Sequence, residues 1–503
     1  MIVEKAKHNP IPTILFTIFS VIMIAFSIYA LIDLVKAAAG EYVSDPEIAA
    51  KIASSLSVVK DAIQNNLGFN FFSLEAVVII VVGVVVVIIL IFLVAMFVTW
   101  LMSRIAAEVS ILIAFALPVL IFVFAALIFG MTAYFSEGLE YAFLFSGIIA
   151  AIGVIVTLFV LWKSRAIFRA GKFIEFSAEL IIANKSLYIF PILMAVGAAL
   201  TTYMASIAGL WITINGDTVL YTVVDKITNE TVRQNQELIV RLLTALALFV
   251  VEFFYVLFYF VIYYILSGMI MSYAARYYIG EDPGPRTAIR DIRQVMPVII
   301  TFATFTTSLH MLLKQIDRLR EKTRFPLNII FGIFHWIIRA FYAFFTYFTL
   351  PAIVIKKKGF FSSSVESGKL VWKHGIDVLV SETGFNLVMV VFSYVNKVTW
   401  AIVGFSFGST ASWKIANGGL LQNIIIGLVV AVIFFQFLSP ISMALIIMPM
   451  KSAFTGFLYC YAIGMEEKIK TDRMPDALES DLRAVSKEAI GSGKRKMKNP
   501  EAG

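Results

Sequence analysis

Long apolar stretches follow one another along most of this sequence, with short polar segments between them. A helix needs about 20 apolar residues to cross the hydrocarbon core of a bilayer. Ten stretches have this length, some with a charge or a proline inside: residues 11–32, 76–103, 109–136, 141–162, 186–215, 242–275, 294–313, 325–355, 386–413 and 415–465. The pattern predicts an all-α, polytopic integral membrane protein with about ten transmembrane helices.

The segments between consecutive stretches predict how the helices connect. Arg104 and Glu108 are the only charges between the second and third stretches, and Glu137 and Glu140 those between the third and fourth. We expect a tight helical hairpin at each place. Interruptions mark three later stretches: Arg339 in the eighth, Lys397 in the ninth, and Pro440, Pro449 and Lys451 in the tenth.

The distribution of basic residues predicts the orientation, because short cytoplasmic loops are enriched in Lys and Arg. Segments 163–185, 276–293 and 356–358 are basic and fall on the side of the amino terminus. The side opposite receives the acidic stretch after the first span and the polar loop 216–237. Both termini are therefore expected in the cytoplasm.

One basic segment, which we expect to be a loop, does not fit this alternation. Residues 314–324 carry five Lys and Arg residues, and they would lie outside if residues 294–313 span the membrane. Two arrangements would resolve the conflict. Either 294–313 is re-entrant, or 325–338 lies along the membrane interface and the number of crossings changes by one.

Two segments have the pattern of short amphipathic interfacial helices. In 48–63 the apolar residues recur at spacings of three and four, and in 167–181 an apolar stripe lies opposite basic and acidic residues. We expect the first on the outer surface and the second on the cytoplasmic surface, where basic side chains meet lipid headgroups or follow the ordinary cytoplasmic bias.

The chain divides into three parts on this interpretation. Residues 1–162 form an N-terminal four-helix membrane part with an outer-surface loop at 36–75. Residues 163–465 form a second membrane part, and residues 466–503 form a soluble cytoplasmic tail.

Composition agrees with the membrane class and narrows the chemistry. Of 503 residues, 60% are apolar and 15% charged, against about 45–50% and about 25% in soluble domains. The single cysteine, Cys460, excludes an internal disulfide or a Cys-rich metal site. The sequence contains no HExxH or Walker motif. We therefore expect no enzymatic activity, no cofactor and no metal, and we attribute the net charge of +8 to cytoplasmic loops rather than to nucleic-acid binding.

Ionisable residues inside apolar stretches are the candidates for function, because their burial in hydrocarbon is costly. Glu252, Arg339 and Lys397 are such residues. Aromatic residues surround Glu252 in sequence or stand in a neighbouring aromatic stretch, and we select four of them: Tyr255, Tyr259, Tyr263 and Phe345. A carboxylate with aromatic faces suits an organic cation, since ring quadrupoles attract ammonium groups.

Two other interpretations of these residues stay open. Aromatic side chains at this density also face lipid or pack between helices. Glu252 could instead pair with Arg339 or Lys397 in a structural role, since a buried ion without a partner is expensive.

Several landmarks of the second half occur together in a known order. A basic amphipathic segment leads to Pro191, an aromatic helix ends in SYAARYY at 272–278, GFFSSS stands at 359–364, and FLYCY at 457–461 precedes two glutamates. This order resembles the choline transporter-like family over residues 164–467, and it is also similar to uncharacterised prokaryotic multi-pass families. The resemblance implies ten helices, cytoplasmic ends and a carrier of choline or ethanolamine. The loop 36–75 departs from the family in having neither cysteines nor glycosylation sequons.

The leading hypothesis is a transporter of a small organic cation or lipid headgroup, similar to choline or ethanolamine, working by alternating access in the plasma membrane. The alternative is a non-catalytic membrane scaffold or a subunit of a membrane protein complex. The expected partners are membrane lipids, the organic cation and other membrane proteins.

Overall fold

The computed structural model describes residues 9–38, 74–135, 139–227, 236–416 and 419–467, and every element in these ranges is helical. The long helices are α1 (Ile11–Ala38), α3 (Leu74–Phe135), α4 (Leu139–Ala183), α5 (Ile189–Ile227), α7 (Gln236–Tyr278), α8 (Pro285–Lys322), α9 (Leu327–Thr346), α11 (Phe360–Ala416), α12 (Leu420–Ile433) and α13 (Ser439–Glu467). Three short elements complete the fold: η1 (Lys185–Tyr188), α10 (Thr349–Lys356) and the π-helical turn η2 (Phe434–Leu438). The expected all-α membrane fold is confirmed.

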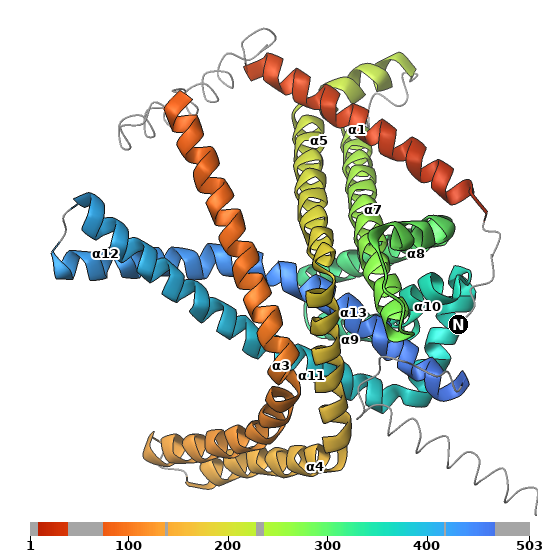
Figure 1. The fold of residues 1–503 in the computed structure, drawn as a ribbon. Helices are drawn as coiled ribbons and strands as arrows, with labels where there is room; N and C mark the ends of the chain where they lie inside the picture. Colours follow the sequence, from red (N-terminus) through yellow and green to blue (C-terminus); the bar gives the residue numbers. More distant parts are fainter. Residues whose placement is uncertain (1–8, 39–73, 136–138, 228–235, 417–418, 468–503) are drawn as a thin grey trace, which may run out of the picture.

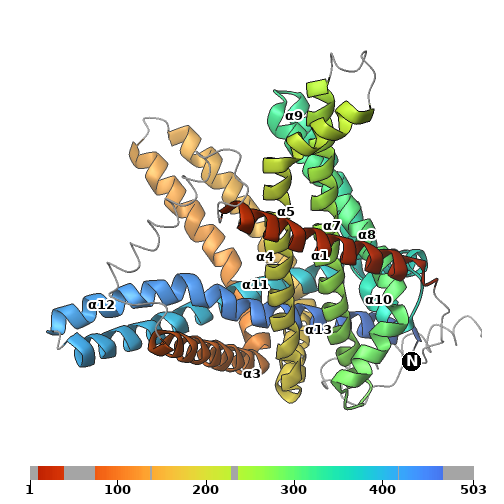
Figure 2. The ribbon, with the colours of Figure 1, turned by 90° about the horizontal axis from the view of Figure 1, so that it is seen from above.

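The helices meet in a centre where α4, α7, α11 and α13 pack together. Almost every residue of α13 from Met450 to Gly464 is buried there, as are Trp400 of α11 and Phe173 of α4. Helices α5 and α7 lie side by side, and α1 crosses both of them (Figures 1 and 2). The α3–α4 and α11–α12 pairs extend away from this centre (Figure 1).

Eight helices in the described ranges are long and apolar enough to cross a bilayer, or nine if the two bent halves of α4 form one span. The ten expected stretches thus correspond to nine helices of the described chain, because eight stretches have a helix of their own and two share one. The difference lies in α3, which joins stretches 76–103 and 109–136 into one 62-residue helix.

The hairpin expected at Arg104 and Glu108 is therefore wrong, because the chain stays helical through this segment. Helix α3 bends instead of reversing (Figure 1). The backbone N–H of Ala107 donates a hydrogen bond to the Glu175 carboxylate of α4 at 2.9 Å. A side chain that engages a backbone group of a helix in this way is a known cause of bending. The later reversal, between α3 and α4, brings these two helices into extensive contact.

The segment 314–324 is also not a loop as expected, since α8 continues to Lys322. The chain turns at residues 323–326, and α9 returns along α8. The five basic residues consequently occupy the last turns of α8 and the turn itself. None of the residues of α9 is buried.

The amphipathic segment 167–181 has the expected apolar stripe, but protein rather than lipid covers it. Ile174 and Ile181 are fully buried, and Phe173 is 1% exposed. They belong to the central core with α13 and α7. Helix α4 bends by 65° before this half. The position of the segment at the cytoplasmic surface stays a prediction.

Most of the loop 36–75, its amphipathic segment 48–63 and nearly all of the tail 466–503 lie outside the described residues. The expected boundary at residue 162 falls inside α4, at its bend. The division into three parts stays a prediction.

Candidate functional site

Glu252, Tyr255 and Tyr259 lie on one face of α7, because residues three, four and seven apart share a helix face. This face borders a cavity of about 560 Å³, which we call the α5–α7 cavity. Its volume is within the roughly 300–1,000 Å³ usual for small-molecule sites. The structure thus brings together three of the five residues that the sequence selected for the substrate.

The opposite wall of the α5–α7 cavity consists of small residues of α5, several of which carry hydroxyls. Helix α8 contributes one histidine. The lining residues are Thr201, Thr202, Ala205, Ser206 and Gly209 of α5; Leu248, Val251, Glu252, Tyr255, Val256, Tyr259 and Phe260 of α7; and His310 of α8.

Glu252 has an ionic partner that the sequence did not indicate. The Lys314 ammonium of α8 donates a hydrogen bond to Glu252 Oε1. The two side chains are 41% and 32% exposed, respectively. The open alternative of an ion pair between Glu252 and Arg339 or Lys397 is not what the structure shows, since the carboxylate pairs with Lys314.

Lys314 also borders a second cavity of about 730 Å³, which we call the α8–α9 cavity. Arg339 lines this cavity, together with Asp317 and His335. The Nδ1 atom of His335 lies 2.8 Å from Asp317 Oδ1. The ring of Phe260 and the His310 imidazole, 5.9 Å apart between centroids, border both cavities.

The remaining selected aromatic residues do not line the α5–α7 cavity. Tyr263 packs edge-on against Tyr264 at 5.5 Å between centroids. Phe345 of α9 lies against Phe341 and close to Gly368 of α11. Tyr263 also packs against a buried cluster of α7, α8 and α10 residues, so packing between helices is the better interpretation for both residues.

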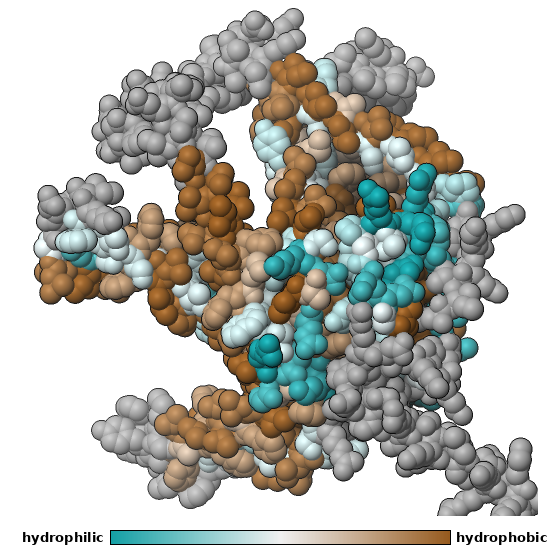
Figure 3. Space-filling view, in the orientation of Figure 1, coloured by the Kyte–Doolittle hydropathy of each residue, from teal (hydrophilic) through white to brown (hydrophobic). Residues whose placement is uncertain are grey.

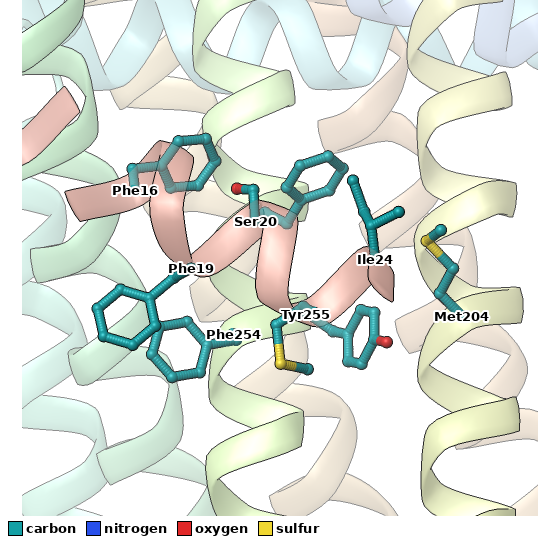
Figure 4. Close-up of a pocket in the computed structure, with 9 residues that line it drawn as sticks. Phe16, Phe19, Ser20, Ile24, Met204, Phe254 and Tyr255 are labelled. Atoms are coloured by element: carbon teal, nitrogen blue, oxygen red, sulfur yellow. The ribbon is translucent and has the colours of Figure 1, made fainter. Parts of the chain in front are cut away.

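Helix α1 covers α7 next to the α5–α7 cavity. Phe19 of α1 stacks on Phe254 of α7 with 4.6 Å between the ring centroids (Figure 4). The hydroxyl groups of Ser27 and Tyr255 share a hydrogen bond. Where α1 crosses α5, it also lies close to Met204 of that helix. Tyr255 is thus fixed from outside the cavity by the first helix of the chain.

The sequence profile of plasma-membrane choline transporters matches residues 147–466, more than half of the chain. The chain belongs to this transporter family. The match contains α5, α7, α8 and α9 and therefore all residues of both cavities. No individual curated protein matches the sequence. The resemblance noted in residues 164–467 is confirmed, and the chain is a multi-pass member of a family of membrane transporters.

In this member of the choline transporter family, Lys397 of α11 lies beside a network of buried polar side chains, which is described below. Its ammonium group stands over the rings of Tyr394 and Phe435, at 5.2 and 5.6 Å from their centroids. Phe435 belongs to η2, and π-helical turns are frequent at functional sites. Lys397 is thus held by aromatic rings of α11 and η2.

The network itself joins α11 to the start of α13. Asn396 donates to the Ser439 carbonyl and hydroxyl, each at 2.9 Å, and Ser442 donates to Asn396 Oδ1 at 2.9 Å. Trp400 Nε1 donates to Ser442 at 2.7 Å. All four side chains are at most 1% exposed.

We expect Asn396→Ala to lower the free energy of unfolding by about 1–2 kcal/mol, because it removes the three buried hydrogen bonds that the Asn396 amide makes with Ser439 and Ser442. Thermal unfolding of the purified protein in detergent measures the change. Ser409→Ala is the control, since Ser409 is only partly buried and donates to the Ser406 carbonyl of its own helix, one turn away. A shift no larger than that of the control would show that the network is not stabilising.

A cluster of charged side chains that the sequence did not indicate connects α7, α8 and the end of α10. Arg276 donates to the Asp291 carboxylate from Nε and Nη2 at 2.9–3.2 Å, and Ser272 donates to Asp291 at 2.8 Å. Lys357 Nζ lies 3.6 Å from Asp291 Oδ1 and donates to Gln294. On the face shown in Figure 3, polar residues gather over the region of α8 and α10, and the helices around this region are largely apolar.

The neighbouring lysines also have a partner in the fold. Lys356 lies 3.0 Å from Glu366 of α11, Lys358 donates to the same carboxylate, and Tyr459 of α13 donates to it at 3.1 Å. Burial alone would raise the pKa of the Glu366 carboxyl, but the two ammonium groups outweigh it and hold that pKa below its ordinary value. The basic run is therefore part of the tertiary structure.

In the described part of the chain, no group of three or more His, Cys, Asp or Glu side chains is arranged to hold a metal ion.

Proposed function

We propose that the protein carries a small organic cation of the choline or ethanolamine type across the plasma membrane by alternating access. The observation that carries this proposal is the Glu252 carboxylate in a cavity with the aromatic side chains of Tyr255, Tyr259 and Phe260. Membership of the choline transporter family supports the substrate class. We further propose that both termini are cytoplasmic and that the protein catalyses no chemical reaction.

The cavity matches the chemistry of such a cation. A quaternary ammonium has no N–H donor, so aromatic faces and a nearby carboxylate are what attract it. Thr201, Thr202 and Ser206 on the opposite wall offer hydroxyl groups to the alcohol of choline or ethanolamine. Each substrate group thus has a complementary wall, the charge facing α7 and the hydroxyl facing α5.

Uptake of labelled choline and ethanolamine into proteoliposomes tests the proposal. We expect saturable uptake above that of empty liposomes, and competition by other quaternary ammonium ions of similar size. Absence of uptake by protein that is folded by circular dichroism would contradict it. That outcome would favour the non-transporting scaffold, which a stoichiometric partner in the purified material would support.

A further inference from the structure

We infer that Lys314 is an intramolecular competitor of the transported cation and sets the affinity of the site. This inference rests on the proposed function, in which Glu252 binds the cation. Without substrate, the Lys314 ammonium occupies the carboxylate. Substrate displaces the ammonium, and Lys314 moves into the α8–α9 cavity.

The position of the pair favours exchange. Glu252 faces the α5–α7 cavity, Lys314 faces the α8–α9 cavity, and the two meet where α7 and α8 pack together. Both side chains keep about a third or more of their surface exposed. Ion pairs with this exposure are weak, because solvent screens them. A cation arriving from the α5–α7 cavity therefore meets a carboxylate whose partner is held only loosely.

The chemistry of Lys314 is that of the substrate class. Its head group is a primary ammonium, as in ethanolamine, and a flexible four-carbon stem carries it. It donates to Oε1 of the carboxylate that would neutralise a substrate cation. Lys314 and substrate therefore compete for the charge of Glu252, since a carboxylate already paired with an ammonium attracts a second cation less strongly.

A displaced Lys314 has another carboxylate within reach. Asp317 is three residues further along α8, on the same helix face, and lines the same cavity. The present contacts of Asp317 are to His335 at 2.8 Å and to Arg320 at 3.7 Å. The ammonium would therefore remain neutralised after it leaves Glu252.

The exchange also couples binding to helix contacts. The Glu252–Lys314 pair ties α7 to α8, and substrate binding would release that tie. Substrate binds only to the fraction of molecules in which Lys314 has left Glu252. The apparent dissociation constant is therefore the intrinsic constant divided by that fraction. Removing the lysine should therefore strengthen binding, which a purely structural ion pair would not do.

The test compares Lys314→Met and Lys314→Arg by choline uptake and by calorimetric choline binding in detergent. Lys314→Met is expected to lower KM and the dissociation constant about fivefold, because the competitor is lost. Lys314→Arg is expected to raise both about threefold, since a guanidinium binds a carboxylate through two parallel hydrogen bonds. Opposite shifts from the two variants would support the inference.

Glu252→Gln separates failure of this inference from failure of the proposed function. Wild-type uptake by Glu252→Gln would remove the cation site from Glu252, and with it the basis for competition. If Glu252→Gln abolishes uptake while Lys314→Met leaves KM unchanged or raises it, the proposed site stands and the competition is wrong. If Lys314→Met does not fold, an unchanged or lower KM in Lys314→Arg would equally overturn the inference.

Discussion

Glu252→Gln is expected to reduce choline uptake at sub-saturating substrate by a hundredfold or more, equivalent to about 2.8 kcal/mol of lost binding free energy. The amide keeps the shape of the side chain but cannot neutralise a cation, and the aromatic walls alone supply a weaker attraction. Uptake into proteoliposomes measures the change. The effect should appear in KM, because the lost interaction acts on the bound ground state.

The matched control is Glu281→Gln, the same substitution at a carboxylate that is 50% exposed and lines neither cavity. It should leave choline uptake within about twofold of wild type, since surface charges away from a site contribute little. Loss of uptake in both variants would indicate a general effect of negative charge. Retention of uptake by Glu252→Gln in folded protein would rule Glu252 out of the mechanism.

The apolar pattern predicted the class of the protein and most of its helices, because a membrane-spanning helix requires an apolar stretch of a defined length. It failed where a short charged segment has two solutions. The segment with Arg104 and Glu108 fits either a turn or a bent helix. The bend is accompanied by a hydrogen bond between Ala107 and Glu175, two residues that are 68 positions apart in the sequence. Such a contact has no local signal.

The candidate site was predictable in one part only. Glu252, Tyr255 and Tyr259 were selected from the sequence, and the structure places all three along one cavity. Their role in binding stays a prediction. The partner Lys314 was missed because its segment was assigned to a loop, whereas α8 extends through it. Phe345 was selected for its aromatic surroundings, which do not specify the neighbouring helix against which a side chain packs.

The Arg276–Asp291–Lys357 cluster is an equally non-local feature, and it determines the second large expected effect. Asp291 is 8% exposed and is the carboxylate shared by Arg276 and Lys357. Lys357 adopts a left-handed backbone conformation with φ of 50° at the end of α10, which is uncommon for residues other than glycine. Through its contacts with Arg276 and Lys357, Asp291 of α8 connects this helix to α7 and to the end of α10.

Asp291→Ala is expected to destabilise the protein by about 3–5 kcal/mol, because it leaves the cations of Arg276 and Lys357 without their shared carboxylate in a buried position. Thermal unfolding in detergent, together with the yield of monodisperse protein, measures this loss. Glu281→Gln is the matched control, since Glu281 pairs with the same arginine at 2.6 Å but is 50% exposed. That variant should change stability by less than about 1 kcal/mol. Equal effects of the two substitutions would mean that burial of Asp291 adds nothing, and that helix packing alone holds α7, α8 and α10 together.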